Sequence, residues 1–258
     1  MSNIKEAFTK KAFIAFITCG DPDLSTTEEI AVMMAKNGVD MIELGIPFSD
    51  PTAEGPVIQN ANIRALQNGV TTDKIFDMVK RIRMRTQIPL AFMTYANVVY
   101  SYGIEKFIKK AATLGIDGLI LPDVPYEEKE EFCCACRQNK IDFISLIAPT
   151  SQDRITTITK EASGFIYCVS SLGVTGTRDN IETNLDSIIK IVRKNTNIPC
   201  AIGFGISTPE QAKYFAHFAD GIIIGSAIIK IIEQHGQDCL HPLQEYILNI
   251  KNAIRSGV

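Results

Sequence analysis

The sequence lacks the features that mark several broad classes of protein. Its net charge is only −3 over 258 residues, and no basic stretch is suited to follow a nucleic-acid backbone, so we expect no nucleic-acid partner. The longest apolar segment, residues 221–232, is interrupted by Lys230 and is too short to cross a bilayer. Residues 1–5 lack the apolar stretch of a signal peptide. These absences predict a cytoplasmic protein that does not interact with membranes.

The residues that bind metals are few or dispersed. There are three histidines, at positions 217, 235 and 241, and they are scattered. Of the seven cysteines, three cluster in one helical-looking stretch: Cys133, Cys134 and Cys136. No second cluster of cysteine or histidine completes a zinc site, so we expect no metal and interpret the cysteines as thiols of a reducing compartment.

Short apolar runs alternate with segments of helical spacing along the whole chain. Their near-continuous apolarity is typical of strands buried on both faces, as in a parallel sheet. Eight such alternations in 258 residues favour a (β/α)8 TIM barrel, which needs about 250 residues, over a doubly wound open sheet. We predict one α/β domain over residues 1–258, with an extra N-terminal helix and active-site loop insertions. The eight predicted strands are residues 12–17, 41–44, 90–93, 118–121, 143–147, 165–169, 200–203 and 221–224.

The joints between these segments also repeat. Two of them, residues 38–40 and 115–117, read Gly-Val-Asp and Gly-Ile-Asp, with a glycine where a helix should end just before a strand. Residues 25–28, Ser-Thr-Thr-Glu, resemble a capping box. Thr208 followed by Pro209 predicts a second helix start.

Glycine-bearing loops follow the sixth, seventh and eighth predicted strands. Barrels of this class commonly hold phosphate on the loops after strands seven and eight. Glycine lets the main chain approach a ligand closely, and a helix start supplies free N–H donors. The alternative is that the glycines only make tight turns. We predict a phosphate site at Gly176, Gly203, Gly205, Gly225 and Ser226.

Two glutamates mark the second strand and the loop after it. Glu43 stands inside an otherwise apolar run, and burial would raise its pKa enough for it to donate and accept a proton near neutrality. The alternative for Glu43 is a structural ion pair. Glu54, between Ala53 and Gly55, is placed to swing over the barrel mouth. In the same loop Asp50 is as consistent with a turn as with catalysis.

Several segments resemble the tryptophan synthase α subunit family over nearly the whole chain. The most specific is Glu43-Leu-Gly-Ile-Pro-Phe-Ser-Asp-Pro51, followed by Gly55-Pro56. A second, residues 16–22, carries Cys19 where the family usually has alanine. The other matching segments, in the family's order and spacing, are residues 121–125, 173–176, 203–207 and 225–227.

The resemblance implies a lyase of tryptophan biosynthesis (EC 4.2.1.20) that cleaves indole-3-glycerol phosphate to indole and D-glyceraldehyde 3-phosphate. Glu43 is implied to shuttle the proton. Glu54 stands where the family has an aspartate that polarises the indole N–H, so it keeps the charge but is one methylene longer. The substrate-binding residues that the resemblance implies are Phe16, Tyr167, Thr175 and Phe204, of which Thr175 bonds the second carboxylate.

The resemblance also implies a partner. The family forms an α2β2 heterotetramer in which the β subunit carries pyridoxal phosphate and receives indole, whereas the α chain needs no cofactor of its own. Loop closure on the loaded complex would activate the α chain. Two alternatives stay open: a catalytically weakened α-type subunit that mainly activates the β subunit, and another phosphate-binding barrel such as a sugar-phosphate isomerase or epimerase.

Overall fold

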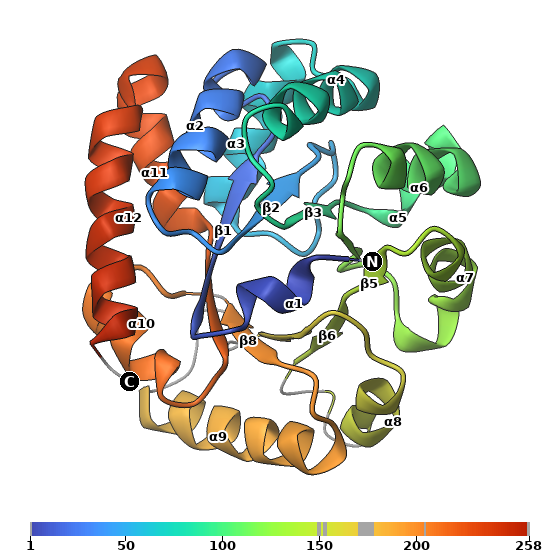
Figure 1. Cartoon of the computed structure of the whole chain (residues 1–258), viewed down its shortest axis with the longest axis vertical. Helices are drawn as coiled ribbons and strands as arrows, with labels where there is room; N and C mark the ends of the chain where they lie inside the picture. The colour runs from blue at the N-terminus through green and yellow to red at the C-terminus, as the bar shows by residue number, and fades with distance from the viewer. Residues whose placement is uncertain (1, 149–150, 152–153, 170–177, 204, 257–258) are drawn as a thin grey trace.

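The paired strands of the protein all run parallel and curl into a nearly closed barrel with helices around it (Figure 1). The computed structural model describes residues 2–148, 151, 154–169, 178–203 and 205–256. Within them the strand order is β5-β4-β3-β2-β1-β9-β8-β7-β6, which confirms the predicted barrel. The strands are β1 (Ala12–Thr18), β2 (Met41–Gly45), β3 (Leu90–Met93), β4 (Gly118–Ile120), β5 (Asp142–Phe143), β6 (Ser145–Ile147), β7 (Ile166–Val169), β8 (Cys200–Gly203) and β9 (Gly221–Ile224).

The fifth predicted strand is divided into two strands, which the sequence did not indicate. We expected one strand over residues 143–147, but the structure has two pieces, β5 and β6, separated by Ile144. β5 pairs with β4 through Gly118 and Asp142, whereas β6 pairs with β7 through Ser145 and Ile166. The chain bends at Ile144, so that β5 forms one edge of the sheet beside β4 and β6 forms the other edge beside β7. The bend thus brings the two edges of the sheet together.

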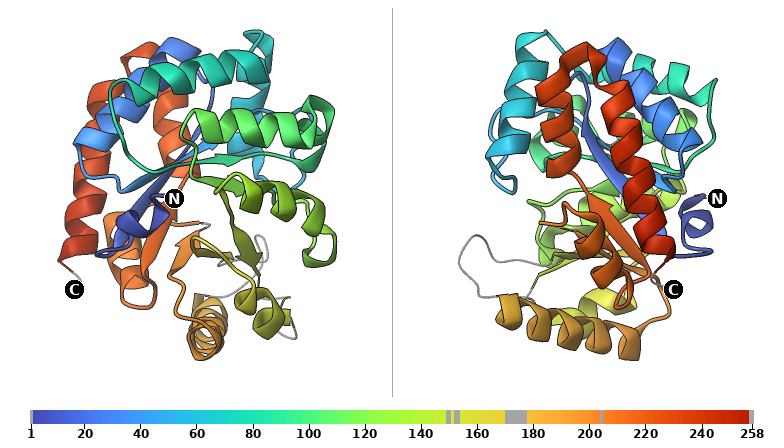
Figure 2. Two further views of the ribbon diagram at one scale, coloured as in Figure 1. Left: turned by 45° about the vertical axis from the view of Figure 1, so that its right-hand side comes forward. Right: turned by 90° about the vertical axis from the view of Figure 1, so that its left-hand side faces the viewer.

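The helices lie outside the strands, apart from the short N-terminal one. α1 lies across the end of the barrel that faces the viewer in Figure 1, and α12 packs beside α2 (Figure 2). The 3-10 helices are η1 (Tyr126–Glu128) and η3 (Gly236–Asp238). The α-helices are α1 (Ile4–Ala7), α2 (Leu24–Lys36), α3 (Pro56–Gln67), α4 (Thr72–Arg83), α5 (Ala96–Tyr102), α6 (Ile104–Thr113), α7 (Glu130–Gln138), α8 (Ile155–Lys160), α9 (Arg178–Asn195), α10 (Pro209–Ala216), α11 (Ser226–His235) and α12 (Leu240–Arg255).

The predicted helix starts had mixed outcomes. α10 begins with Thr208 as its cap, and Gln211 completes a capping box, which confirms that prediction. The capping box predicted at residues 25–28 was wrong, because α2 begins at Leu24 and its cap is Asp23. The Asp23 carboxylate accepts the backbone N–H of Thr26 at 2.8 Å, so it takes the role that we assigned to a serine hydroxyl.

Three aspartates hold the N-terminal ends of the strands together. Asp40, Asp117 and Asp220 each directly precede a strand and accept the backbone N–H of a residue in the preceding strand of the chain, at 2.8–3.0 Å. Each also pairs with a basic side chain, respectively Lys251, Arg83 and Arg193. The glycines of the two predicted joints, Gly38 and Gly115, have φ of +97° and +78°, as a helix-ending glycine requires. The repeated Gly-x-Asp joint is therefore a structural device of this end.

Candidate active site

Glu43 is a buried carboxyl group without a protein partner. It lies in the middle of β2, in register with Phe16 of β1, and its side chain has no exposed surface. Neither carboxylate oxygen has a hydrogen-bond partner among the described residues. Burial raises the pKa of Glu43 to about 8. The alternative of a structural ion pair for Glu43 finds no support among the described residues, and the group carries its proton at neutral pH.

Glu54 is a second carboxyl group with a raised pKa, and it is held by neutral donors. The amide of Asn62 donates to its Oε2 at 3.1 Å, and the Tyr95 hydroxyl also donates to it. Burial raises the pKa of Glu54 to about 7, although the two hydrogen bonds oppose that rise. Near neutrality Glu43 is therefore mainly protonated, while Glu54 is divided between its two forms.

Tyr95 fixes the loop that carries Glu54. Its hydroxyl accepts the backbone N–H of Ala53 at 3.0 Å, and its ring stacks on Phe48 at 5.2 Å between centroids. We did not single out Tyr95 or Asn62 from the sequence. Tyr95 stands two residues beyond the end of β3, where the rule about strand ends would have found it. Asn62 lies within α3, and nothing in its spacing indicated that it reaches Glu54.

Glycines make room for two aromatic rings inside the barrel. A Cβ atom at Gly45 would lie 2.6 Å from the ring of Phe16, and one at Gly225 would lie 3.2 Å from it. A Cβ atom at Gly203 would lie 2.5 Å from the hydroxyl of Tyr167. These contacts place Phe16 between β2 and β9, and Tyr167 against β8. The glycines are thus required for the fit of the rings.

The two rings and the two carboxyl groups belong to one region. The pKa of Tyr167 is raised well above its usual value, first by burial and then by the charges of Glu43 and Glu54. A cavity of about 320 Å³ opens beside Tyr167 and reaches Ala53, the neighbour of Glu54. Its volume suits a small ligand, and apolar side chains form much of its wall. Among the residues that line it are Met93, Leu121, Phe143, Leu146 and Val169.

The helices after β8 and β9 differ in whether side chains cap the backbone N–H groups at their starts. In α10, the Gln211 side chain accepts from the backbone N–H of Ser207 and Thr208, and Thr208 accepts from Gln211. α11 begins at the exposed Ser226 after Gly225, and no side chain of a described residue caps it. The first N–H groups of α11 are therefore the ones available to an anion.

Some of the predicted residues lie elsewhere. Thr175, Gly176 and Phe204 are outside the described residues. Gly205 is exposed, with φ of +77°. Asp50 is exposed and accepts the Ser49 hydroxyl at 2.6 Å, which favours the turn interpretation over the catalytic one.

The three clustered cysteines share one helix. Cys133 and Cys136 lie on α7, as free thiols, with Cys134 between them. Over the described residues, no group of three or more histidine, cysteine or acidic side chains is arranged to hold a metal ion. None of the described helices combines the length and apolarity needed to span a membrane.

The fold and the site together define a class: a (β/α)8 barrel with carboxyl groups of raised pKa in the barrel interior and in the loop after β2. Comparison with known proteins specifies the family. The family model for the tryptophan synthase alpha chain matches residues 1–255. The chain therefore belongs to the tryptophan synthase alpha chain family, and it is a lyase of tryptophan biosynthesis.

Individual members of the family are similar to this chain over most of their length. The tryptophan synthase alpha chain of Lacticaseibacillus casei is 46% identical over 255 residues, which cover 98% of this chain and 96% of that one. The alpha chain of Alkaliphilus metalliredigens is 49% identical over 231 residues, or 90% and 87% of the two chains. The solved structure of tryptophan synthase subunit alpha from Campylobacter jejuni has a TM-score of 0.88 at 35% identity, and covers 97% of this chain and 99% of that one.

Proposed function

We propose that this chain cleaves indole-3-glycerol phosphate to indole and D-glyceraldehyde 3-phosphate, with Glu43 as the acid–base residue. The observation that carries the proposal is the isolation of Glu43, which is fully buried with no partner for either oxygen among the described residues. A carboxyl group whose pKa is about 8 is protonated at neutral pH and is well suited first to donate and then to accept a proton.

Each proton in the proposed reaction has a donor and an acceptor. Glu43 donates its proton to C3 of the indole ring, and ionised Glu54 accepts the proton of the ring N–H. Glu43 then removes the proton of the hydroxyl on the attached carbon. The C–C bond breaks, its electrons return to the ring, and the hydroxyl carbon becomes the aldehyde. Glu54 returns its proton to the ring nitrogen, so both carboxyl groups end as they began.

The rest of the proposed site binds the two ends of the substrate. Phe16 and Tyr167, which are 4% and 6% exposed, form apolar walls for the indole ring, and we assign Phe204 the same role. The phosphate is bound at the start of α11, by Gly225 and Ser226, together with Gly176, Gly203 and Gly205. Thr175 bonds Glu54 when the loops close. These assignments rest on the positions of the motifs and, for α11, on its uncapped start.

The family implies a β-subunit partner, and this β subunit is the one that depends on pyridoxal phosphate. We propose the α2β2 stoichiometry, an α chain without a cofactor of its own, and loop closure that is driven by the loaded partner. We also propose that residues 1–258 form one domain and that the protein is cytoplasmic. One sheet that contains all the strands from β1 to β9 of the described residues supports the single domain.

The proposal is tested by adding indole-3-glycerol phosphate to the chain, with and without its β subunit, and measuring indole. We expect slow indole formation by the chain alone and faster formation in the complex. The absence of indole in both cases, together with increased β-subunit activity, would overturn the proposed reaction. That result would identify a weakened subunit that acts mainly as an activator.

A further inference from the structure

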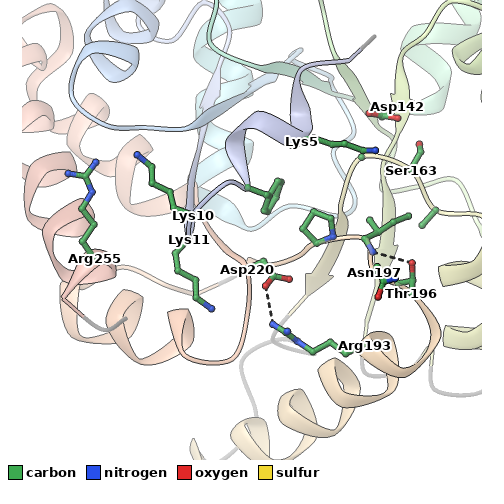
Figure 3. Close-up of a pocket in the computed structure, with 15 residues that line it drawn as sticks. Lys5, Lys10, Lys11, Asp142, Ser163, Arg193, Thr196, Asn197, Asp220 and Arg255 are labelled. Atoms are coloured by element: carbon green, nitrogen blue, oxygen red, sulfur yellow. Dashed lines mark hydrogen bonds and ion pairs between the residues drawn. The ribbon is translucent and has the colours of Figure 1, made fainter.

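A second pocket lies at the opposite end of the barrel from the proposed active site. Its volume is about 1440 Å³, and it opens at the N-terminal ends of the strands beside α1. Figure 3 shows that its walls come from the N-terminal segment, from α9 and from α12, with the turns before β8 and β9 between them. Nothing in the proposed reaction uses this end of the barrel.

The pocket is strongly basic within an acidic protein. Five basic side chains line it against two acidic ones, which gives a formal charge of +3, whereas the whole chain carries −3. Asp220, one of the two acids, is already bound to Arg193 at 3.0 Å and to the backbone of Cys200. The lining basic residues are Lys5, Lys10, Lys11, Arg193 and Arg255.

Two of the five cations are uncommitted within the described part of the chain. Lys5 and Arg255 are exposed, and neither side chain has a hydrogen bond or ion pair to another described residue. Lys11 donates to the backbone oxygen of Ala219 at 2.7 Å. The pKa of Lys11 is lowered by burial, and also by the positive charge of Arg193, although Asp220 opposes this. A further negative charge in the pocket would relieve that repulsion.

The floor of the pocket is apolar. Phe8 forms part of it and contacts Phe165 at 5.5 Å between ring centroids. Ile198 and Pro199 extend this surface, and the exposed amide of Asn197 stands at its edge. Cations from separate elements around a concave floor focus the electrostatic field on a small volume more than a flat basic patch does. A concave site of this volume has room for a ligand that carries an organic part beside its anionic group.

We propose that this pocket binds a small anion that carries at least two phosphate groups in a chain. The formal excess of three positive charges over the acids that line the pocket matches the charge of such a group better than that of a single carboxylate. Arginine and lysine together suit phosphate, because arginine presents paired donors and lysine a compact charge. The apolar floor leaves room for an organic group attached to the phosphates, as in a nucleotide.

The probe for this site is inorganic tripolyphosphate, titrated by calorimetry into the full chain at pH 7.5 and 0.15 M salt. A parallel titration with magnesium-free adenosine triphosphate distinguishes an inorganic ligand from a nucleotide, because only the nucleotide gains contacts with the floor. We expect saturable one-to-one binding of tripolyphosphate. The absence of saturable binding would overturn the proposal.

A pair of double variants locates the site. Lys5→Gln with Arg255→Gln removes the two uncommitted cations, and we expect affinity for tripolyphosphate to fall about tenfold. The matched control, Lys36→Gln with Lys109→Gln, makes the same charge change at exposed positions outside the pocket and should leave affinity nearly unchanged. Equal affinities in the two double variants would overturn the proposed site. Indole formation should be the same in both, so this outcome is independent of the proposed lyase reaction.

Discussion

Buried carboxyl groups at the N-terminal end of the barrel have ion-pair and hydrogen-bond partners, whereas the buried carboxyl group of Glu43 has none among the described residues. At the N-terminal ends of the strands, Asp117 accepts from the backbone of Asn3 and Leu90 and pairs with Arg83 at 3.1 Å. Inside the barrel, Glu43 is also buried but has no hydrogen-bond partner among the described residues. Partners stabilise the charge of the first carboxylate, whereas burial alone destabilises the charge of the second.

This difference separates a structural carboxylate from a reactive one. The aspartates that precede the strands are bound by backbone N–H groups and basic side chains of the fold, which is typical of structural carboxylates. Glu43 and Glu54 have raised pKa values, about 8 and about 7, because burial disfavours their charged forms and no basic side chain among the described residues is paired with them. Among buried acidic residues, the presence or absence of ion-pair and hydrogen-bond partners therefore helps to indicate the role.

The strongest test of the comparison removes the reactive proton. Glu43→Gln keeps the shape of the side chain, so we expect substrate affinity to survive. Indole formation should fall by about a thousandfold or more, since the amide neither donates nor accepts this proton. Steady-state indole release and equilibrium binding of the substrate measure the two effects. Unchanged turnover in the variant would remove Glu43 from the mechanism.

The converse change removes a saturated carboxylate. Asp117→Ala removes the ion-pair partner of the partly buried Arg83 and leaves two backbone N–H groups without their acceptor. We expect the free energy of unfolding to fall by about 3 kcal/mol, as measured by urea denaturation. A loss close to zero would contradict the structural role that we assign to this residue.

The raised pKa of Glu43 also predicts how stability depends on pH. The folded state binds this proton more tightly than the unfolded state, whose pKa is near 4.5. The contribution of Glu43 to stability is therefore fully present below pH 4.5 and is lost as pH rises towards 8. At pH 9, Glu43→Gln should be more stable than the unaltered chain by roughly 5 kcal/mol, and at pH 5 nearly equal to it. Urea denaturation at both values measures this, and a difference that does not change with pH would contradict it.

The smallest expected effect concerns the length of the second carboxylate. Glu54→Asp should keep or raise indole formation, with a change of no more than about tenfold, if the loop follows the family's geometry. The matched control, Asp50→Glu, changes an exposed carboxylate of the same loop by one methylene in the other direction and should have no effect. A large loss in Glu54→Asp alone would show that the loop has adjusted to the longer side chain.

The sequence predicted the strands well where apolarity alone determines them. β3, β8 and β9 have the predicted bounds, because each is a continuous apolar run with a clear start. The bend at Ile144 was not predictable in this way, since it depends on pairing with β4 on one side and with β7 on the other. An apolar run carries no information about such a change of neighbour.

The candidate site was predictable to a similar degree. Glu43 stood out because a charge in an apolar strand is unusual, and the structure confirms its burial. The hydrogen bonds of Glu54 were not predictable, because Asn62 and Tyr95 come from other elements and meet it only in the folded chain. Sequence patterns thus indicated which groups carry the chemistry, but not which neighbours tune them.

Tyr95 couples the position of its neighbouring loop to the protonation of Glu54. Its single hydroxyl accepts from the backbone of the loop at Ala53 and also donates to Glu54. If the loop moves away from Tyr95, Glu54 loses a bond that favours its ionised form, and the proton affinity of this group changes in the same event. The position of the loop and the proton affinity of Glu54 are therefore coupled through Tyr95.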